Sequence, residues 1–149
     1  MEQAPGPASD AVTLMKNWYE TSSAMEAAVG SVLRELGLTL SQAEMLWALE
    51  PSTPPVPMRE LARKLHFDPS NISLMTDRLV AAGLVERRPH PTDGRKRVPA
   101  LTGKGLEVWA LLIDQVRRRS PLFALAPEEQ AQLSRLLEKA ARSASEHGS

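Results

Sequence analysis

Residues 68–105 read DPSNISLMTDRLVAAGLVERRPHPTDGRKRVPALTGKG, and the fold that we predict is based on this segment. Its first part is typical of a helix, because Asp68 suits the N-cap, Pro69 suits the first turn and Gly83 supplies a stop. Apolar residues recur in it at helical spacing and predict an inward-facing stripe, which comprises Ile72, Met75, Leu79 and Ala82. The opposite face of this helix carries small polar residues.

A shorter helix is predicted immediately before this one. Pro57 suits its first turn, and its apolar residues are Met58, Leu61, Ala62 and Leu65. Residues 66–68 join the two helices into a helix-turn-helix, in which the N-terminal part of the second helix enters the major groove of DNA. The side chains that we expect to meet DNA from this helix are Ser70, Asn71, Ser73, Asp77 and Arg78.

A basic β-hairpin follows, with strands predicted over 84–88 and 97–101 and a turn marked by Asp93-Gly94. Such a hairpin is the wing of a winged helix-turn-helix. Arg95, at its tip, suits the narrow minor groove, where the negative potential of DNA is enhanced. We expect Asp93 to accept hydrogen bonds from the Arg95 guanidinium and to orient it. Pro99 lacks a backbone donor, which predicts an edge strand or a local distortion.

A long helix is predicted near the N-terminus, over residues 10–37. Asp10 suits its N-cap and Gly37 its stop. At 1.5 Å per residue this helix runs for roughly 40 Å, which is longer than a compact domain of this size covers with its own partners. We therefore expect it to extend into a dimer interface. Residues 1–9, rich in Pro, Gly and Ala, predict a loose tail.

Three further helices are predicted from start and stop signals. Ser41 and Glu44 match the S-x-x-E capping box of a short helix that ends before the Pro-rich break at 51–57. Thr102 caps a fifth helix, and Pro127 opens a sixth. Both of these helices are amphipathic, so they can pack with the first helix across a two-fold axis.

These elements together predict a mainly α fold. It is a winged helix-turn-helix with a small β-hairpin wing, and its N- and C-terminal helices form an intertwined homodimer. We expect a single domain over 10–149. Within it, residues 41–102 form the DNA-binding lobe, and residues 10–37 and 104–145 form the dimerisation helices.

Charge and composition restrict the function classes. Residues 1–58 hold two basic against seven acidic side chains, whereas residues 59–104 hold ten basic against five acidic, so positive charge concentrates on the predicted lobe. The absence of cysteine excludes disulfides and thiolate metal sites. No apolar stretch approaches the ~20 residues of a membrane span, so we expect a cytoplasmic protein. No catalytic constellation occurs at a recognisable spacing, and we expect neither an enzyme nor a cofactor.

The chain closely resembles the multiple-antibiotic-resistance regulator (MarR) family over roughly residues 10–145. The run Leu84-Val85-Glu86-Arg87-Arg88, Asp93-Gly94-Arg95 and Leu101-Thr102-Gly103-Lys104-Gly105 is similar to the family's G-L-V, D-x-R and L-T-x-x-G pattern. The resemblance implies a dimeric regulator that binds pseudo-palindromic operators and is often released by a small ligand. Pro99 and the Pro-rich stretch at 51–57 depart from the pattern.

The DNA-binding set that we predict is Ser70, Asn71, Ser73, Asp77, Arg78, Arg87, Arg88, Asp93, Arg95, Lys96 and Arg97. The hairpin cations suit phosphate contacts, although a merely solvated basic face is the alternative. Asp77 and Arg78 have a second interpretation, in which they pair with neighbours and fix the recognition helix. The three consecutive arginines at 117–119 splay around the fifth helix and are assigned to no site.

A pocket for a small aromatic or lipophilic effector is expected between the dimer helices and the DNA-binding lobe. Its candidate residues are Met15, Trp18, Tyr19, Met45, Trp47 and Trp109, most of which also suit ordinary core packing. His66, His90 and His147 are too dispersed to predict a metal site. Two alternatives to a ligand-released repressor remain: a winged-helix module that binds protein, and a metal-responsive repressor.

Overall fold

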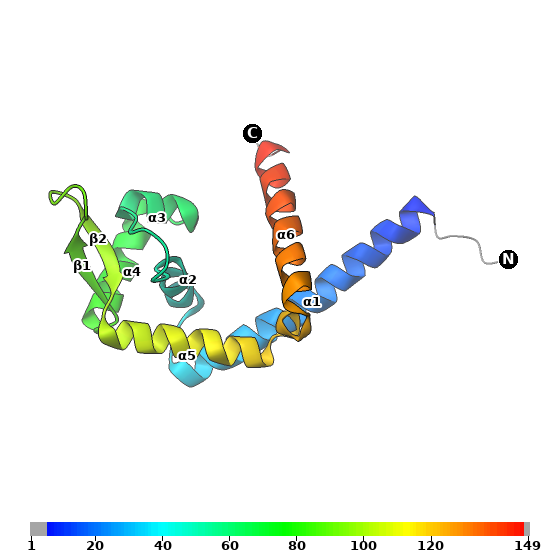
Figure 1. Cartoon of the computed structure of the whole chain (residues 1–149), viewed down its shortest axis with the longest axis horizontal. Helices are drawn as coiled ribbons and strands as arrows, with labels where there is room; N and C mark the ends of the chain where they lie inside the picture. The colour runs from blue at the N-terminus through cyan, green and yellow to red at the C-terminus, as the bar shows by residue number, and fades with distance from the viewer. Residues whose placement is uncertain (1–5, 148–149) are drawn as a thin grey trace. The chain divides into compact units, whose positions relative to one another are not determined.

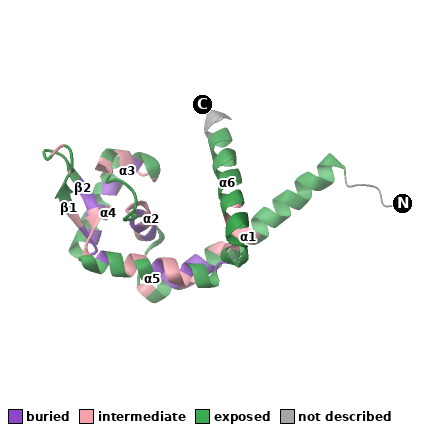
Figure 2. Cartoon of the chain, viewed as in Figure 1, coloured by how far each residue is buried: buried purple, intermediate pink, exposed green. Residues whose placement is uncertain are grey.

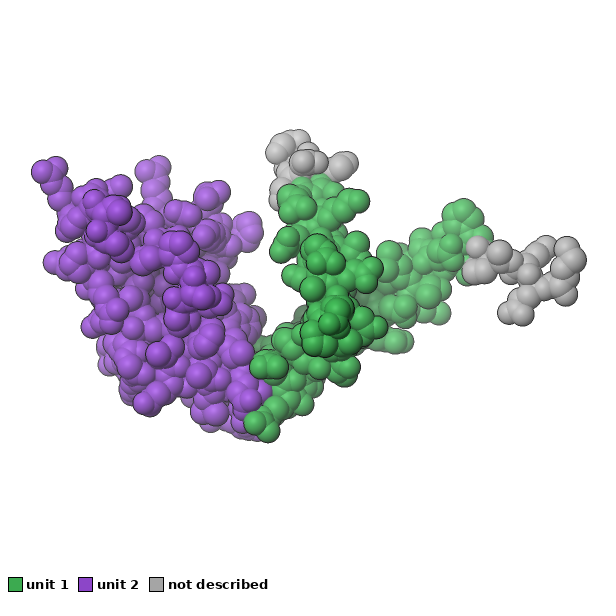
Figure 3. Space-filling model, viewed as in Figure 1, with its two compact units in different colours: residues 1–29, 116–149 green, residues 30–115 purple. Residues whose placement is uncertain are grey.

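The computed structural model describes residues 6–147, and within them the chain forms two compact units (Figure 3). Unit 1 comprises 6–29 and 116–147, and unit 2 comprises 30–115. The elements along the chain (Figure 1) are α1 (Pro7–Leu36), α2 (Leu40–Ala48), α3 (Met58–Lys64), α4 (Pro69–Ala81), β1 (Val85–Pro89), β2 (Arg97–Leu101), α5 (Gly103–Arg119), the short 3-10 helix η1 (Pro121–Ala124) and α6 (Pro127–His147). The predicted mainly helical fold with one two-stranded hairpin is confirmed.

The start of α1 differs from the prediction. The helix begins at Pro7, because the backbone N–H groups of Ser9 and Asp10 both donate to the carbonyl of Gly6, at 2.8 and 3.2 Å. Asp10 is therefore a first-turn residue, where its charge suits the helix dipole, and is not the N-cap. Residues 7–9 of the predicted tail are helical, and residues 1–5 of it lie outside the described residues.

The capping box of α2 is also displaced from its predicted position. Thr39 is the N-cap: its Oγ1 accepts from the N–H of Gln42 at 3.2 Å, and Gln42 Oε1 accepts from the N–H of Thr39 at 2.9 Å. The predicted pair, Ser41 and Glu44, lies two residues later, inside the helix. Both pairs have the spacing of a capping box, and the helix uses the earlier one. At α3, Pro57 is the N-cap with extended backbone, one position before the first turn.

Left-handed backbone follows the ends of α1, α3 and α4. Gly83, at φ +73°, follows α4, and there its N–H donates to Val80 O while Leu84 N–H donates to Leu79 O. This is the Schellman arrangement that glycine favours, and it confirms the predicted stop. Gly37 ends α1 at φ +66° in the same way. The turn between α3 and α4 instead uses a non-glycine residue, His66, at φ +54°.

Unit 2 has a continuous core, visible as the buried residues of α2, α4 and the hairpin in Figure 2. From α4 the buried residues are Ile72, Thr76 and Leu79. The expected stripe is therefore corrected at two positions, since Ala82 is exposed and Met75 is only partly buried. Completely or almost completely buried side chains from the other elements of the core are Met45, Leu46, Leu61, Val85, Val98 and Leu112.

The hairpin pairs β1 and β2 antiparallel, and β1 starts one residue later than predicted. Backbone bonds from Thr102 N–H to Leu84 O and from His90 N–H to Lys96 O mark the hydrogen-bonded pairs at its two ends. Hydrogen-bonded and non-bonded pairs alternate along such a ladder, so the Arg87–Pro99 pair is a non-bonded one. Pro99 thus costs the ladder no hydrogen bond and fits without distortion.

Unit 1 contains the N-terminal part of α1, the end of α5, η1 and α6. Ser120 caps η1 through a bond from Leu122 N–H to its Oγ, 3.3 Å long, and that Oγ also lies 2.9 Å from Met25 Sδ. Pro127 occupies the first position of α6, as predicted. Among the described residues, no helix has the length and apolar character needed to cross a membrane.

Candidate nucleic-acid interface

The first turns of α4 expose a small polar surface. Asp68 is the N-cap and Pro69 the first helical residue, as predicted, although the Asp68 side chain makes no capping bond. Because Ile72, Thr76 and Leu79 fix which face is buried, the polar residues at the N-terminal end project outward. The exposed side chains of the predicted set on this helix are Ser70, Asn71, Ser73, Asp77 and Arg78. The structure therefore presents these five groups to solvent on one helix.

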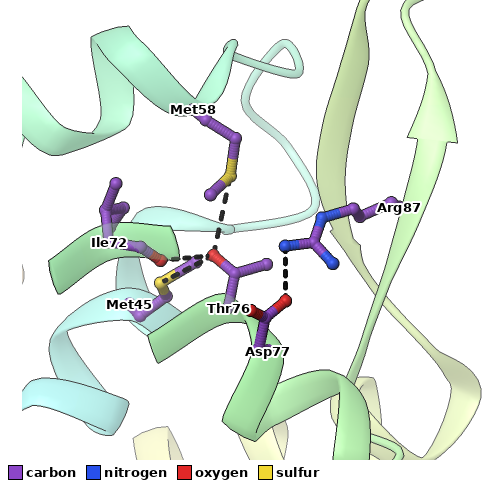
Figure 4. A network of polar contacts seen from close by, with 6 residues as sticks. All are labelled: Met45, Met58, Ile72, Thr76, Asp77 and Arg87. Carbon is purple, nitrogen blue, oxygen red and sulfur yellow. Dashed lines mark hydrogen bonds and ion pairs between the residues drawn. The ribbon is translucent and has the colours of Figure 1, made fainter. Parts of the chain in front are cut away.

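An ion pair connects this helix to the hairpin. Arg87 Nη2 donates to Asp77 Oδ1 at 2.7 Å, with side-chain exposures of 38% and 59% respectively (Figure 4). An ion pair this exposed contributes little stability, about 0–1 kcal/mol, so its main effect is geometric. The positioning interpretation of Asp77 matches this contact, and the charge of Arg87 is partly neutralised by it.

A buried hydroxyl group on α4, that of Thr76, contacts residues of the neighbouring helices. Thr76 Oγ1 donates to Ile72 O at 2.7 Å, one turn earlier in α4. Two sulfurs lie around the same hydroxyl, Met58 Sδ at 3.5 Å and Met45 Sδ at 3.9 Å (Figure 4). Thr76 is fully buried, and it thereby joins α2, α3 and α4 at one point. Thr76 was not predicted as a core residue, because a single threonine between Met75 and Asp77 carries no periodic apolar signal.

The cationic side chains of the wing differ in whether they form ion pairs. Arg88 is paired with Glu86, and Lys96 Nζ lies 3.8 Å from Asp93 Oδ2. Neither Arg95 nor Arg97 forms an ion pair within the part of the chain that the structure describes, and both are exposed. These two guanidinium groups are thus available to an anionic partner.

The predicted role of Asp93 is wrong in its detail. Its Oδ1 accepts from the backbone N–H of Arg95 at 3.2 Å, and not from the guanidinium. The turn explains this difference: Lys96 N–H donates to Asp93 O, so the chain folds back and brings the Arg95 amide to the carboxylate. Asp93 therefore fixes the backbone at the wing tip and leaves the Arg95 side chain extended into solvent.

The base of the wing is locked to the start of α5 and the end of α4. Thr102 Oγ1 donates to Gly83 O and accepts from the N–H of Gly105 at 3.0 Å, which confirms Thr102 as a cap. Lys104 Nζ donates to Ala82 O at 3.1 Å. A Cβ on Gly105 would lie 1.8 Å from Leu84 O, so only glycine fits there. The L-T-x-x-G run is thus a joint that sets the wing against the helix-turn-helix.

One exposed residue of α4 was missed by the sequence analysis. Leu74 has 50% of its surface exposed, and it lines a shallow hollow with Asn71 and Arg78, together with Ser41, Phe67 and Met75. A helical-wheel projection of α4 places Leu74 on the outward face, since it lies one turn from both Ser70 and Arg78. An apolar group therefore sits in the middle of the polar outward surface.

The structure divides the predicted effector residues between the two units. Met45 is fully buried in the core of unit 2 beside Thr76, so its assignment to an open pocket is corrected to core packing. Trp47 and Trp109, also in unit 2, are partly buried.

The remaining three belong to α1 in unit 1. Trp18 lines an apolar pocket of about 400 Å³ together with residues of η1 and α6. Met15 and Tyr19 line a separate hollow on α1. The described residues contain no group of three or more His, Asp or Glu side chains that could hold a metal ion.

Comparisons with known proteins agree with this geometry. A family model described as "MarR family" matches residues 36–96. AbsC, a MarR family transcriptional regulator from Streptomyces coelicolor, is 25% identical with a TM-score of 0.67, covering 95% of this chain and 97% of its own. The Mycobacterium tuberculosis MarR family protein Rv2887, solved in complex with DNA, is 28% identical with a TM-score of 0.63, covering 85% and 96%. CouR, a transcriptional repressor bound to a 23-mer DNA duplex, is 25% identical with a TM-score of 0.62, covering 95% and 99%. No curated protein matched the chain.

Proposed function

Since this chain belongs to the MarR family of DNA-binding transcriptional regulators, which are not enzymes, we propose that it is a repressor of pseudo-palindromic operators. A small effector relieves its binding to DNA. The protein acts in the cytoplasm as a homodimer, the assembly typical of this family. Dimer symmetry presents two copies of α4 to successive major grooves, about 34 Å apart.

In this proposal, α4 reads the bases. Ser70, Asn71 and Ser73 occupy its first two turns and are exposed, so their hydrogen-bonding groups reach base edges when the N-terminus of the helix enters the groove. Arg78 lies about two turns after Ser70 and suits a phosphate beside the major groove. Asp77 holds Arg87, which fixes the angle between the reading helix and the wing.

The wing supplies phosphate and minor-groove contacts. Arg88, Lys96 and Arg97 give the hairpin its positive charge, and phosphate neutralisation makes affinity depend steeply on salt. The observation that carries the proposal is at the wing tip: Asp93 accepts from the Arg95 backbone N–H, and no ion pair among the described residues occupies the Arg95 guanidinium. A cation presented on a fixed backbone loses little entropy when it enters the minor groove.

The effector is a small aromatic or lipophilic molecule. Among the predicted residues, Trp18 offers the best wall for it, because its pocket is apolar except for Asn17, Thr21 and Ser22 and lies within the usual size range of ligand sites, about 300–1,000 Å³. An effector weakens DNA binding only by its preference for a state that fits DNA poorly. Titration of the protein–DNA complex with a panel of aromatic compounds tests this step, and Trp18→Ala should reduce the response.

The experiment for the proposed function is fluorescence anisotropy on DNA from upstream of the protein's own gene. We expect tight binding, weaker binding to random-sequence DNA of equal length, and a steep decrease in affinity with salt. In vitro transcription from the same DNA should decrease when the protein is added. If neither DNA is bound at low salt, the proposal fails, and if binding raises transcription, the protein is an activator.

A further inference from the structure

Leu74 occupies the centre of the outward face of α4. It follows Ile72 by two residues, which places it about 200° around the helix from a side chain that is 98% buried. Ser70 and Arg78 lie one turn before and one turn after it on the same face. Half of its surface is exposed, and the buried face of α4 is formed by Ile72, Thr76 and Leu79 without it.

The neighbours of Leu74 are groups that suit DNA. Asn71 and Arg78 line the same shallow hollow as Leu74, and no ion pair within the described residues occupies Arg78. The surrounding segment, residues 59–104, carries ten basic and five acidic side chains. Phe67 and Met75 also line this hollow but are partly buried. The exposed Leu74 side chain thus lies beside amide, hydroxyl and guanidinium groups on a surface whose charge suits an anionic partner.

Major-groove chemistry provides a specific partner for an apolar group there. Thymine presents its 5-methyl group in the major groove, whereas cytosine presents an amino donor, which an aliphatic side chain would desolvate without replacing its hydrogen bond. Contact between a leucine and a thymine methyl removes apolar surface of both from water.

We propose that Leu74 reads a thymine in each operator half-site through contact with its 5-methyl group. This inference rests on the proposed function, in which α4 enters the major groove. It assigns to one residue a base preference that the polar residues of the same helix do not provide, since their hydrogen bonds cannot detect a methyl group.

The test is a cycle of two changes that remove only this contact. The operator is first selected from a random-sequence library with the wild-type protein, and each thymine of a half-site is then replaced singly by deoxyuridine, which keeps base pairing and loses the methyl. Binding is measured by anisotropy for the wild type, Leu74→Ala and Val80→Ala. Val80 is the matched control, because it is an exposed apolar residue of α4, 37% exposed, about 120° around the helix and about 9 Å along it from Leu74.

We expect one thymine whose replacement weakens wild-type and Val80→Ala binding about fourfold, the factor expected for one buried methyl group. For Leu74→Ala the same replacement should change affinity by less than about 1.5-fold, because the methyl has lost its partner. Circular dichroism checks that both variants are folded.

Two outcomes contradict the inference. If Leu74→Ala keeps the full discrimination between thymine and uracil, or if no replacement weakens the wild type, Leu74 reads no methyl group while operator binding stands. If the library yields no bound sequence at all, the proposed function itself fails.

Discussion

The two units of this molecule differ in how completely they bury their own apolar side chains. Unit 2 buries side chains from α2, α3, α4, α5 and the wing in one core, and its polar contacts join neighbouring elements. Unit 1 leaves large apolar side chains exposed, namely Val12, Leu14, Met15, Trp18, Tyr19, Phe123, Leu125, Leu136 and Leu137. An apolar surface of this extent on one unit is typical of an interface. We infer that unit 2 is self-sufficient, whereas unit 1 needs the second copy proposed above.

The largest expected effect is a loss of stability in unit 2, at the contact between Gly105 and Leu84. Gly105→Ala would place a Cβ 1.8 Å from Leu84 O, which is backbone and cannot move aside without shifting the wing. We expect a loss of about 3–5 kcal/mol in the free energy of unfolding, measured by urea denaturation.

Gly103→Ala is the matched control for that experiment, because nothing lies within 4 Å of the added Cβ two residues earlier in the same helix. Its stability should stay within about 0.5 kcal/mol of the wild type. Equal stability of the two variants would mean that the Leu84 carbonyl does not limit this position.

The next effect should be confined to unit 1. Leu137→Glu puts a charge on the pocket wall that also contains Trp18, and we expect it to raise the dimer dissociation constant about 30-fold, equivalent to about 2 kcal/mol. Sedimentation equilibrium measures this, and Gln132→Glu, an exposed position on the same helix, is the control for added charge. A dimer unaffected by Leu137→Glu would place the interface elsewhere.

A smaller effect tests whether Asp77 positions the wing. Asp77→Asn removes the pair with Arg87, and its cost in stability should stay below about 1 kcal/mol because both side chains are well exposed. Random-sequence DNA should be bound slightly more tightly, since a negative charge is lost, while the ratio of operator to random affinity falls about fivefold. Asp68→Asn makes the same charge change at the N-cap, where the side chain makes no capping hydrogen bond, and should leave that ratio unchanged.

The smallest effect concerns the turn of the helix-turn-helix. His66 has φ +54°, a left-handed conformation that costs a side-chain-bearing residue about 1 kcal/mol and glycine almost nothing. His66→Gly should stabilise unit 2 by about 0.5 kcal/mol, after part of the gain is offset by the greater freedom of the unfolded chain. Thermal unfolding checks this, and His90→Gly, at a residue with no left-handed backbone, should give no gain.

The helix-turn-helix and the wing were predictable because the signals in their sequence are local. Asp68-Pro69, Gly83 and Asp93-Gly94 each constrain the backbone within a few residues, and the elements between them follow from periodicity. The capping box of α2 was misplaced because a local signal can occur twice. Thr39–Gln42 and Ser41–Glu44 both have the required spacing, and only the three-dimensional structure shows that the helix uses the first pair.

The contacts that position the site were less predictable. Asp77 of α4 and Arg87 of β1 are ten positions apart in the sequence, and whether they pair depends on the angle between the two elements. The bond from the Arg95 amide to Asp93 depends on how the turn closes, which the residue types alone leave open between backbone and side-chain donors. Leu74 was passed over because a leucine in a helix is first read as core, and only its measured exposure places it on the outward face.

If α4 and the wing bind DNA together, Arg95→Ala should have a lower affinity for the operator than the wild type. We predict a loss of about 1–3 kcal/mol by anisotropy, partial recovery in Arg95→Lys, and no change in Arg142→Ala, which removes the same charge from α6. Wild-type affinity in Arg95→Ala at every salt concentration would contradict the role assigned to the wing.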